Sequence, residues 1–212
     1  MKNSILTLTL LLAANIMIAQ GNYEKGISTG IEMLKKCNST ESANNCSNYF
    51  ERVAEANKNE WLPLYYAAYA SLSSGFYEKD PAKKDELFLR GISFIDRAKS
   101  VEANESEIIA IEAYLRLMYI SNDAMKRAPS QTGEAIGLLE QAKELDPSNP
   151  RPWFVHGQNT FYTPEFFGGG VKNAKPLLEK ADALYKSFKP KNELMPVWGN
   201  ERCNKLLEEC GK

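Results

Sequence analysis

The feature that most constrains the fold is a triplet of residues that recurs along the chain at helical spacing. In each copy a small residue is followed after four positions by a bulky aliphatic one, and after three more by a second small residue. The copies begin at residues 91, 135 and 174, so they lie 44 and 39 residues apart. Small residues let a neighbouring helix approach closely, so the triplets predict helices that pack in a row and share one apolar seam. The triplets are Gly91, Ile95 and Ala98; Ala135, Leu139 and Ala142; and Ala174, Leu178 and Ala181.

The rest of the chain shows the same helical period, with apolar residues at steps of three and four and no alternating strand-like runs. The sequence therefore predicts an all-α solenoid of helical hairpins with a C-terminal capping helix. In that capping helix Cys203, Leu206 and Leu207 face the preceding hairpin, while Glu201 and Arg202 are among the residues expected to face water. The predicted helices are Asn22–Cys37, Cys46–Asn57, Glu60–Gly75, Ala82–Glu102, Glu105–Lys126, Gln131–Leu145, Pro150–Phe161, Val171–Ser187 and Glu193–Glu209.

Residues in the second half of the chain carry a family resemblance. Trp153 and Gly157, together with the last two triplets and Pro147, resemble the tetratricopeptide repeat (TPR) over residues 131–187. The match is degenerate over 60–104 and extends only to a hairpin over 22–57. The copies are longer than the 34 residues of that family, which we ascribe to enlarged loops within the hairpins. The stretches W-L-P-L-Y-Y-A-A-Y at 61–69, N-P-R at 149–151, T-P-E-F-F-G-G-G at 163–170 and P-V-W-G at 196–199 also resemble a group of exported bacterial TPR-like proteins. The resemblance implies that the first helices of the hairpins line a concave, partner-binding side.

The N-terminus predicts export. Lys2 precedes an apolar run from Ile5 to Ile18, and Ala19 offers a small residue for cleavage, so residues 1–20 resemble a secretory signal peptide. A retained N-terminal anchor is the alternative. We expect residues 21–212 to form the TPR-like domain, periplasmic or secreted, with no membrane-spanning segment after cleavage.

Charge and motifs argue against several function classes. The chain has 26 basic and 27 acidic residues, a net charge of −1, so no overall field favours nucleic acid. It has one histidine, His156, and lacks the G-x-S-x-G, H-E-x-x-H and Walker-type motifs. We therefore expect neither an enzyme nor a metal or cofactor site.

Four cysteines in an exported chain raise the question of disulfides. Cys37 and Cys46 each continue an apolar helical stripe at facing ends of one hairpin, so we predict a disulfide between them; two packed free thiols are the alternative. Cys203 and Cys210 are two helical turns apart, about 10.5 Å, so we expect buried thiols there.

The candidate binding residues are aromatic and polar side chains on first helices, because Tyr and Trp combine a large apolar area with a polar tip. Arg151 either binds a carboxylate or pairs internally, with Glu165 or the next repeat. Trp198 is expected to plug the end of the core. The partner-binding candidates are Tyr65, Tyr66, Tyr69, Tyr114, Arg151, Gln158, Phe161 and Tyr162.

The segment after Tyr162 is a second candidate. Its residues Glu165, Phe166, Gly168, Gly169 and Gly170 could form a ligand or partner loop, since glycines permit close backbone approach. Alternatively, the glycines serve only the turn, and the two phenylalanines are tucked under it. The function these features favour is a non-catalytic scaffold that binds a protein or peptide in the cell envelope. A periplasmic solute-binding accessory that encloses a small apolar ligand beside this loop is the alternative, and a structural filler of a larger complex is a third.

Overall fold

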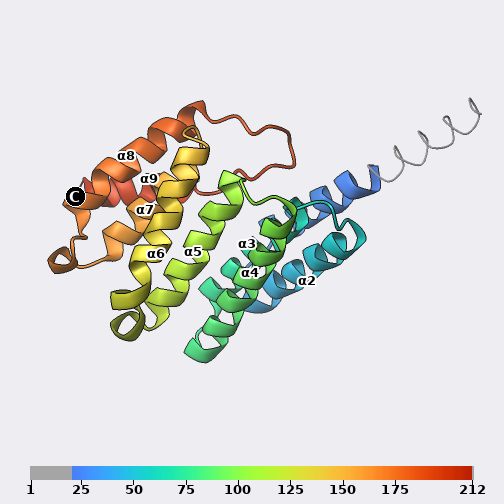
Figure 1. The fold of residues 1–212 in the computed structure, drawn as a ribbon, viewed down its shortest axis with the longest axis horizontal. Coiled ribbons are helices and arrows are strands. Elements are labelled where there is room, and N and C mark those ends of the chain that lie inside the picture. Colours follow the sequence, from blue (N-terminus) through green and yellow to red (C-terminus); the bar gives the residue numbers. More distant parts are fainter. Residues whose placement is uncertain (1–20, 212) are drawn as a thin grey trace, which may run out of the picture.

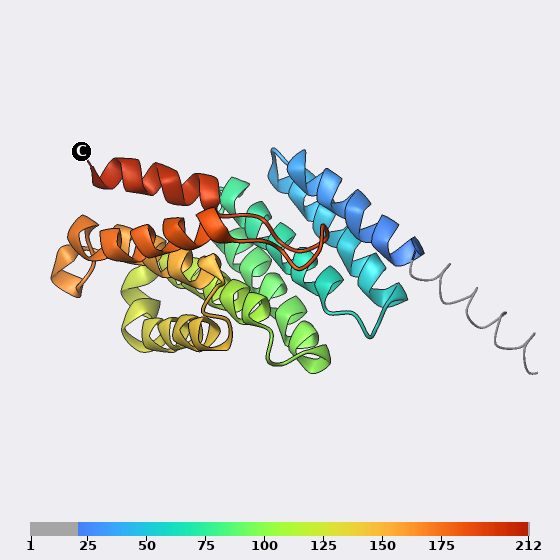
Figure 2. The same cartoon turned by 90° about the horizontal axis from the view of Figure 1, so that it is seen from above.

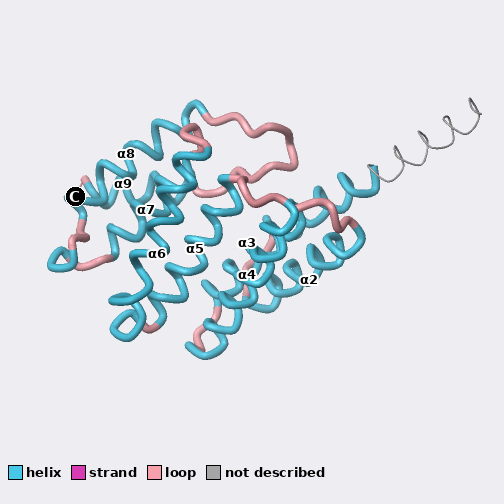
Figure 3. Tube along the Cα trace, viewed as in Figure 1, coloured by secondary structure: helices cyan, strands magenta, loops and turns pink. Residues whose placement is uncertain are grey.

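The computed structural model describes residues 21–211, and all regular structure in this range is helical (Figures 1 and 3). A helix covers residues 21–35, and a 3-10 turn, η1, covers Glu165–Phe167. The other helices are α2 (Thr40–Ala56), α3 (Leu62–Tyr77), α4 (Pro81–Val101), α5 (Ser106–Asn122), α6 (Ala124–Leu145), α7 (Pro150–Tyr162), α8 (Val171–Ser187) and α9 (Asn200–Cys210).

The helices pair as hairpins and the hairpins stack in a row. The 21–35 helix pairs with α2, α3 with α4, α5 with α6 and α7 with α8, while α9 packs against α7 and α8 at the end of the row (Figure 2). The predicted all-α fold of stacked hairpins is therefore confirmed.

The recurring triplets lie where the helices meet. All nine of their residues are buried. A Cβ atom on Gly91 would lie 2.6 Å from a methyl carbon of Leu115, and one on Gly157 would lie 2.8 Å from Leu178. A larger residue at either position would force the facing leucine to shift, so these small positions allow neighbouring helices to lie close together.

The last predicted helix begins later than expected. Instead of starting at Glu193, α9 starts at Asn200, because Pro196 cannot donate a backbone hydrogen bond and Gly199 has a φ of +106°. Residues 188–199, here called the crossing segment, run instead as a long loop after α8 (Figure 3). The hydroxyl of Tyr66 donates to the carbonyl of Leu194 over 2.7 Å, so this loop lies against α3.

The expected enlarged loops are present at one connection. Only the α7–α8 connection is a long loop within a hairpin; α4 and α6 are themselves long, at 21 and 22 residues. The predicted boundary between 126 and 131 also moves, because α5 ends at Asn122 and α6 begins at Ala124 with Pro129 inside it. The 44-residue spacing therefore reflects the long helices α5 and α6, whereas the 39-residue spacing reflects the loop at 163–170, as expected.

The predicted signal peptide, residues 1–20, lies outside the described residues. Within residues 21–211, no helix combines the length and apolarity that crossing a bilayer requires.

The cysteines are thiols in this structure. Cys46 is buried, its Sγ lies 3.6 Å from the carbonyl of Gly30, and it contacts the thiol of Cys37. Burial raises the pKa of Cys46 to about 12. The Cys37–Cys46 bridge stays a prediction that this proximity supports. Cys203 is buried against the carbonyl of Leu178, and Cys210 is partly buried.

Candidate ligand-binding cleft

An aromatic cleft of about 570 Å³ opens on the side of the stack formed by the first helices of three hairpins. Helices α3, α5 and α7 each contribute side chains from one face, and the crossing segment and α9 supply the remainder. We call this hollow the aromatic cleft; it is lined by Tyr69, Phe76, Tyr114, Met118, Ser121, Phe154, Gln158, Tyr162, Trp198, Gly199 and Arg202.

The rings of the cleft are stacked around Trp198. Its indole lies 5.1 Å from the ring of Tyr69 at an interplanar angle of 20°, and 5.8 Å from the ring of Tyr114 at 27°. Phe154 meets the same indole edge-on at 6.2 Å. Phe154 and Tyr114 are buried and form the floor, whereas Phe76 and Tyr162 are 51% and 60% exposed and form the rim. The cleft therefore has buried aromatic rings at its floor and half-exposed aromatic rings at its mouth.

The polar atoms of the floor are engaged in internal hydrogen bonds. The amide of Gln158 donates to the hydroxyl of Tyr114 over 2.8 Å, and the indole N–H of Trp198 donates to the hydroxyl of Tyr65 over 2.7 Å. Burial raises the pKa of Tyr114 to about 12 and raises the pKa of Tyr69 further. Both phenols therefore remain protonated near neutral pH, and the floor carries no charge.

The rim of the cleft carries a cation. The side chain of Arg202 is 41% exposed and donates from Nη2 to the hydroxyl of Tyr162. Its Nη1 lies 3.5 Å from a carboxylate oxygen of Glu209. Arg202 thus spans from α9 to α7 at the mouth of the cleft.

A buried ion pair fixes the crossing segment beneath the cleft. Arg151 is fully buried; its Nη1 donates to Glu107 over 2.7 Å and its Nη2 donates to the carbonyl of Pro196. Its guanidinium also lies over the rings of Trp198 and Phe188. Burial raises the pKa of Glu107 to about 7, against the opposing effect of Arg151. The pair therefore positions Trp198 through contacts with its ring and with Pro196, although neither Arg151 nor Glu107 lines the cleft.

The predicted binding residues divide into two groups. Tyr69, Tyr114, Gln158 and Tyr162 line the cleft together. The remaining four do not line it: Tyr65, Tyr66 and Arg151 are buried, and Phe161 is half-buried and packs against Tyr162. Arg151 makes its internal ion pair with Glu107 rather than with Glu165, because α7 lies beside α5.

Sequence reasoning missed five lining residues that carry apolar or charged contacts. Phe76 and Met118 follow Tyr69 and Tyr114 by seven and four positions, a same-face spacing that could have identified them. Phe154 precedes Gln158 by four positions and carries the same signal, whereas Trp198 and Arg202 have no such spacing from a predicted binding residue. Trp198 lines the cleft as well as packing in the core, and Arg202, partly exposed to water as expected, also lines the cleft at its mouth.

The loop at 163–170 lies outside the residues that line the cleft, although it follows Tyr162 directly. Phe166 and Phe167 are 92% and 71% exposed, so they are not tucked under the turn as the alternative interpretation expected. A Cβ atom on Gly169 would lie 2.0 Å from the carbonyl oxygen of Thr163, and Gly168 and Gly170 have positive φ. The glycines therefore serve the turn, which presents the two rings to solvent.

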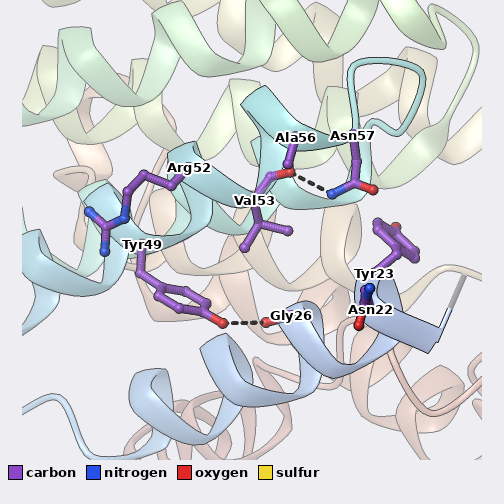
Figure 4. Close-up of a pocket in the computed structure, with 8 residues that line it drawn as sticks. All are labelled: Asn22, Tyr23, Gly26, Tyr49, Arg52, Val53, Ala56 and Asn57. Atoms are coloured by element: carbon purple, nitrogen blue, oxygen red, sulfur yellow. Dashed lines mark hydrogen bonds between the residues drawn. The ribbon is translucent and has the colours of Figure 1, made fainter. Parts of the chain in front are cut away.

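A smaller hollow of about 400 Å³ lies between the 21–35 helix and α2 (Figure 4). The hydroxyl of Tyr49 donates to the carbonyl of Gly26 over 3.2 Å, and the amide of Asn57 donates to the carbonyl of Val53 over 2.8 Å. Arg52 lies over the ring of Tyr49. These side chains are used within a single hairpin.

The cleft contains no cluster of metal ligands. No group of three or more His, Cys, Asp or Glu side chains suited to a metal occurs among residues 21–211. His156 lies elsewhere, with its Nδ1 2.9 Å from Nζ of Lys143 and 3.1 Å from Glu140.

Comparison with protein-family models and with curated proteins gives no match to the sequence. Among solved structures, the chain is similar to the HusA haemophore from Porphyromonas gingivalis, with a TM-score of 0.79 and 27% sequence identity. The similarity covers 89% of this chain and 92% of the haemophore chain. The hairpin architecture agrees with the TPR resemblance, while membership of the TPR family stays a prediction because no family model matches.

Proposed function

We propose that this protein is an exported binding protein that holds a flat, largely apolar ring system of the porphyrin class in the aromatic cleft. The observation that carries the proposal is the parallel stacking of Tyr69 and Tyr114 on Trp198 at the wall of a cleft of about 570 Å³. Small-ligand sites are concave, mostly apolar and about 300–1,000 Å³ in volume. The cleft meets all three criteria.

The similarity to a haemophore supports the class of ligand. It extends over nearly the whole of both chains, so the hairpins that build the cleft fall within it. At 27% identity the side chains have diverged widely, and the cleft of this chain therefore has to be tested directly.

The ligand would be held mainly by its ring faces. The one histidine of the chain is not among the lining residues, and the buried phenols of Tyr69 and Tyr114 are protonated near neutral pH. Offset stacking of aromatic rings adds about 0.5–1.5 kcal/mol per pair beyond the burial of area. We therefore expect the apolar wall to supply most of the binding energy.

The test is a titration of the purified mature chain with haem and with iron-free protoporphyrin, followed by Soret absorbance. Phe76 lies on the rim, is half exposed, and has its ring 6.0 Å from Tyr114, so Phe76→Ala removes a cleft contact with little risk to folding. We expect it to weaken binding about 10-fold. Phe166→Ala is the matched control, because it removes the same ring from an exposed site outside the lining. Binding of neither compound, or equal losses in both variants, would refute the proposal.

A protein partner is the second candidate function. Phe166 and Phe167 form an edge-to-face pair with ring centroids 5.2 Å apart, and the glycine turn holds both in solvent. Exposed aromatic rings on a defined turn are typical of contact surfaces between proteins. The same Phe166→Ala variant tests this candidate through capture of a partner, independently of the cleft.

A further inference from the structure

We propose that Arg202 binds a carboxylate of the ligand, and so selects an anionic ligand and fixes its orientation in the aromatic cleft. This inference rests on the proposed function and extends it from a ring system to a ring system that bears an acid group. Arg202 would therefore be a specificity-determining residue.

The charges around the cleft determine where an acid group of the ligand would lie. Of the described residues that line the cleft, Arg202 is the only one with a charged side chain. The floor consists of Phe154, Tyr114 and neutral polar groups whose hydrogen bonds are internal. Burying an unpaired carboxylate among such groups costs several kcal/mol, as a rough estimate. An acidic ligand therefore has one favourable orientation, with its apolar rings inside and its acid group at the rim.

The present partners of Arg202 can be exchanged for a ligand. Its contact with Glu209 is 3.5 Å long and both side chains are more than 40% exposed, so the pair contributes at most about 1 kcal/mol. A ligand carboxylate at the mouth could accept two parallel hydrogen bonds from the planar guanidinium, which is a stronger arrangement. The hydroxyl of Tyr162, already bonded to Nη2, lies beside the same position and can donate a further hydrogen bond.

Geometry also links Arg202 to the ring wall. It follows Trp198 by four residues and α9 begins between them, so the stacking surface and the cation belong to one short stretch of chain. Its guanidinium lies 5.9 Å from the ring of Tyr162 on α7. The acid-binding group therefore stands at the edge of the wall and at the side where the cleft opens.

The experiment compares protoporphyrin, which has two carboxylates, with its dimethyl ester, which has none, on the full mature chain in one buffer with a fixed fraction of cosolvent. Arg202→Gln is expected to weaken binding of the diacid about 10-fold and to change binding of the diester less than twofold. Arg202→Lys keeps the charge but loses the planar guanidinium. Its affinity for the diacid should therefore lie between that of the unmodified protein and that of Arg202→Gln. Lys205→Gln is the matched control, because Lys205 lies on α9 outside the cleft and pairs with Glu201.

A further variant is expected to strengthen binding of the diacid instead of weakening it. Glu209→Gln removes the competing carboxylate and should strengthen binding of the diacid about twofold. If Arg202→Gln leaves the diacid unchanged, or weakens acid and ester equally, Arg202 is only a structural link between α9 and α7. If the unmodified protein binds neither compound, the proposed function itself fails.

Discussion

Two hollows among residues 21–211 are each lined by tyrosines and an arginine, and they differ in how many hairpins build them. The hollow in Figure 4 lies between two helices of one hairpin, and the side chains of Tyr49 and Asn57 donate to the backbone of that hairpin. The aromatic cleft draws on α3, α5 and α7, and the crossing segment brings Trp198 against their rings. One hairpin supplies all the side chains that line the smaller hollow, whereas the aromatic cleft needs chain that reaches across several hairpins.

The largest expected effect is on the free energy of unfolding, and it concerns Arg151, the buried arginine beneath the cleft. Arg151→Met leaves Glu107 buried without its cation, so we expect the free energy of unfolding to fall by about 3–5 kcal/mol in urea titrations. Arg52→Met, at the exposed arginine of the smaller hollow, should change it by less than about 0.5 kcal/mol. Equal losses in the two variants would mean that the crossing segment is not held by Arg151. A double variant with Glu107→Gln should recover part of the loss.

An intermediate effect is expected in the first hairpin. Oxidation of Cys37 and Cys46 closes a loop of about ten residues, which should raise the free energy of unfolding by about 2–3 kcal/mol. Porphyrin affinity should not change, because the aromatic cleft draws on other helices. Urea titrations with and without reductant measure the first quantity, and Soret titration measures the second. Four reactive thiols in the denatured, unreduced mature chain would show that the bridge does not form.

The smallest effect is expected on affinity when the porphyrin contains iron. Haem and iron-free protoporphyrin should bind within about threefold of each other, since the wall of the cleft presents ring faces and protonated phenols. Parallel Soret titrations measure the ratio. An affinity for haem more than 30-fold higher, with the spectrum of an axially ligated iron, would instead assign a ligand such as Met118.

The close packing of neighbouring helices, both within and between hairpins, could be predicted from sequence because it depends on local spacing. Gly91 and Gly157 sit at helical positions where a neighbour must come close, and the structure places Leu115 and Leu178 there. The same logic placed Tyr69 and Tyr114 on first helices, and with them the side of the molecule that carries the cleft.

The remaining features of the cleft depend on contacts between distant parts of the chain. Tyr65 and Trp198 are 133 positions apart, and no periodicity connects them. The apolar spacing of residues 193–199 predicts a helix, but Pro196 and Gly199 delay the start of α9 to Asn200. With this start, Arg202 lies at the cleft. Long-range packing, rather than local propensity, decided both.

The crossing segment runs across the row of hairpins and connects several of them. It is fastened to α3 through Tyr66, to the start of α5 through Glu105 and to α7 through Arg151. Because the crossing segment has a fixed length, it limits how far apart the helices that it contacts can lie. We therefore expect that lengthening or shortening residues 188–199 would change the width of the cleft and the ring systems that fit it, with no substitution in the helices that line it.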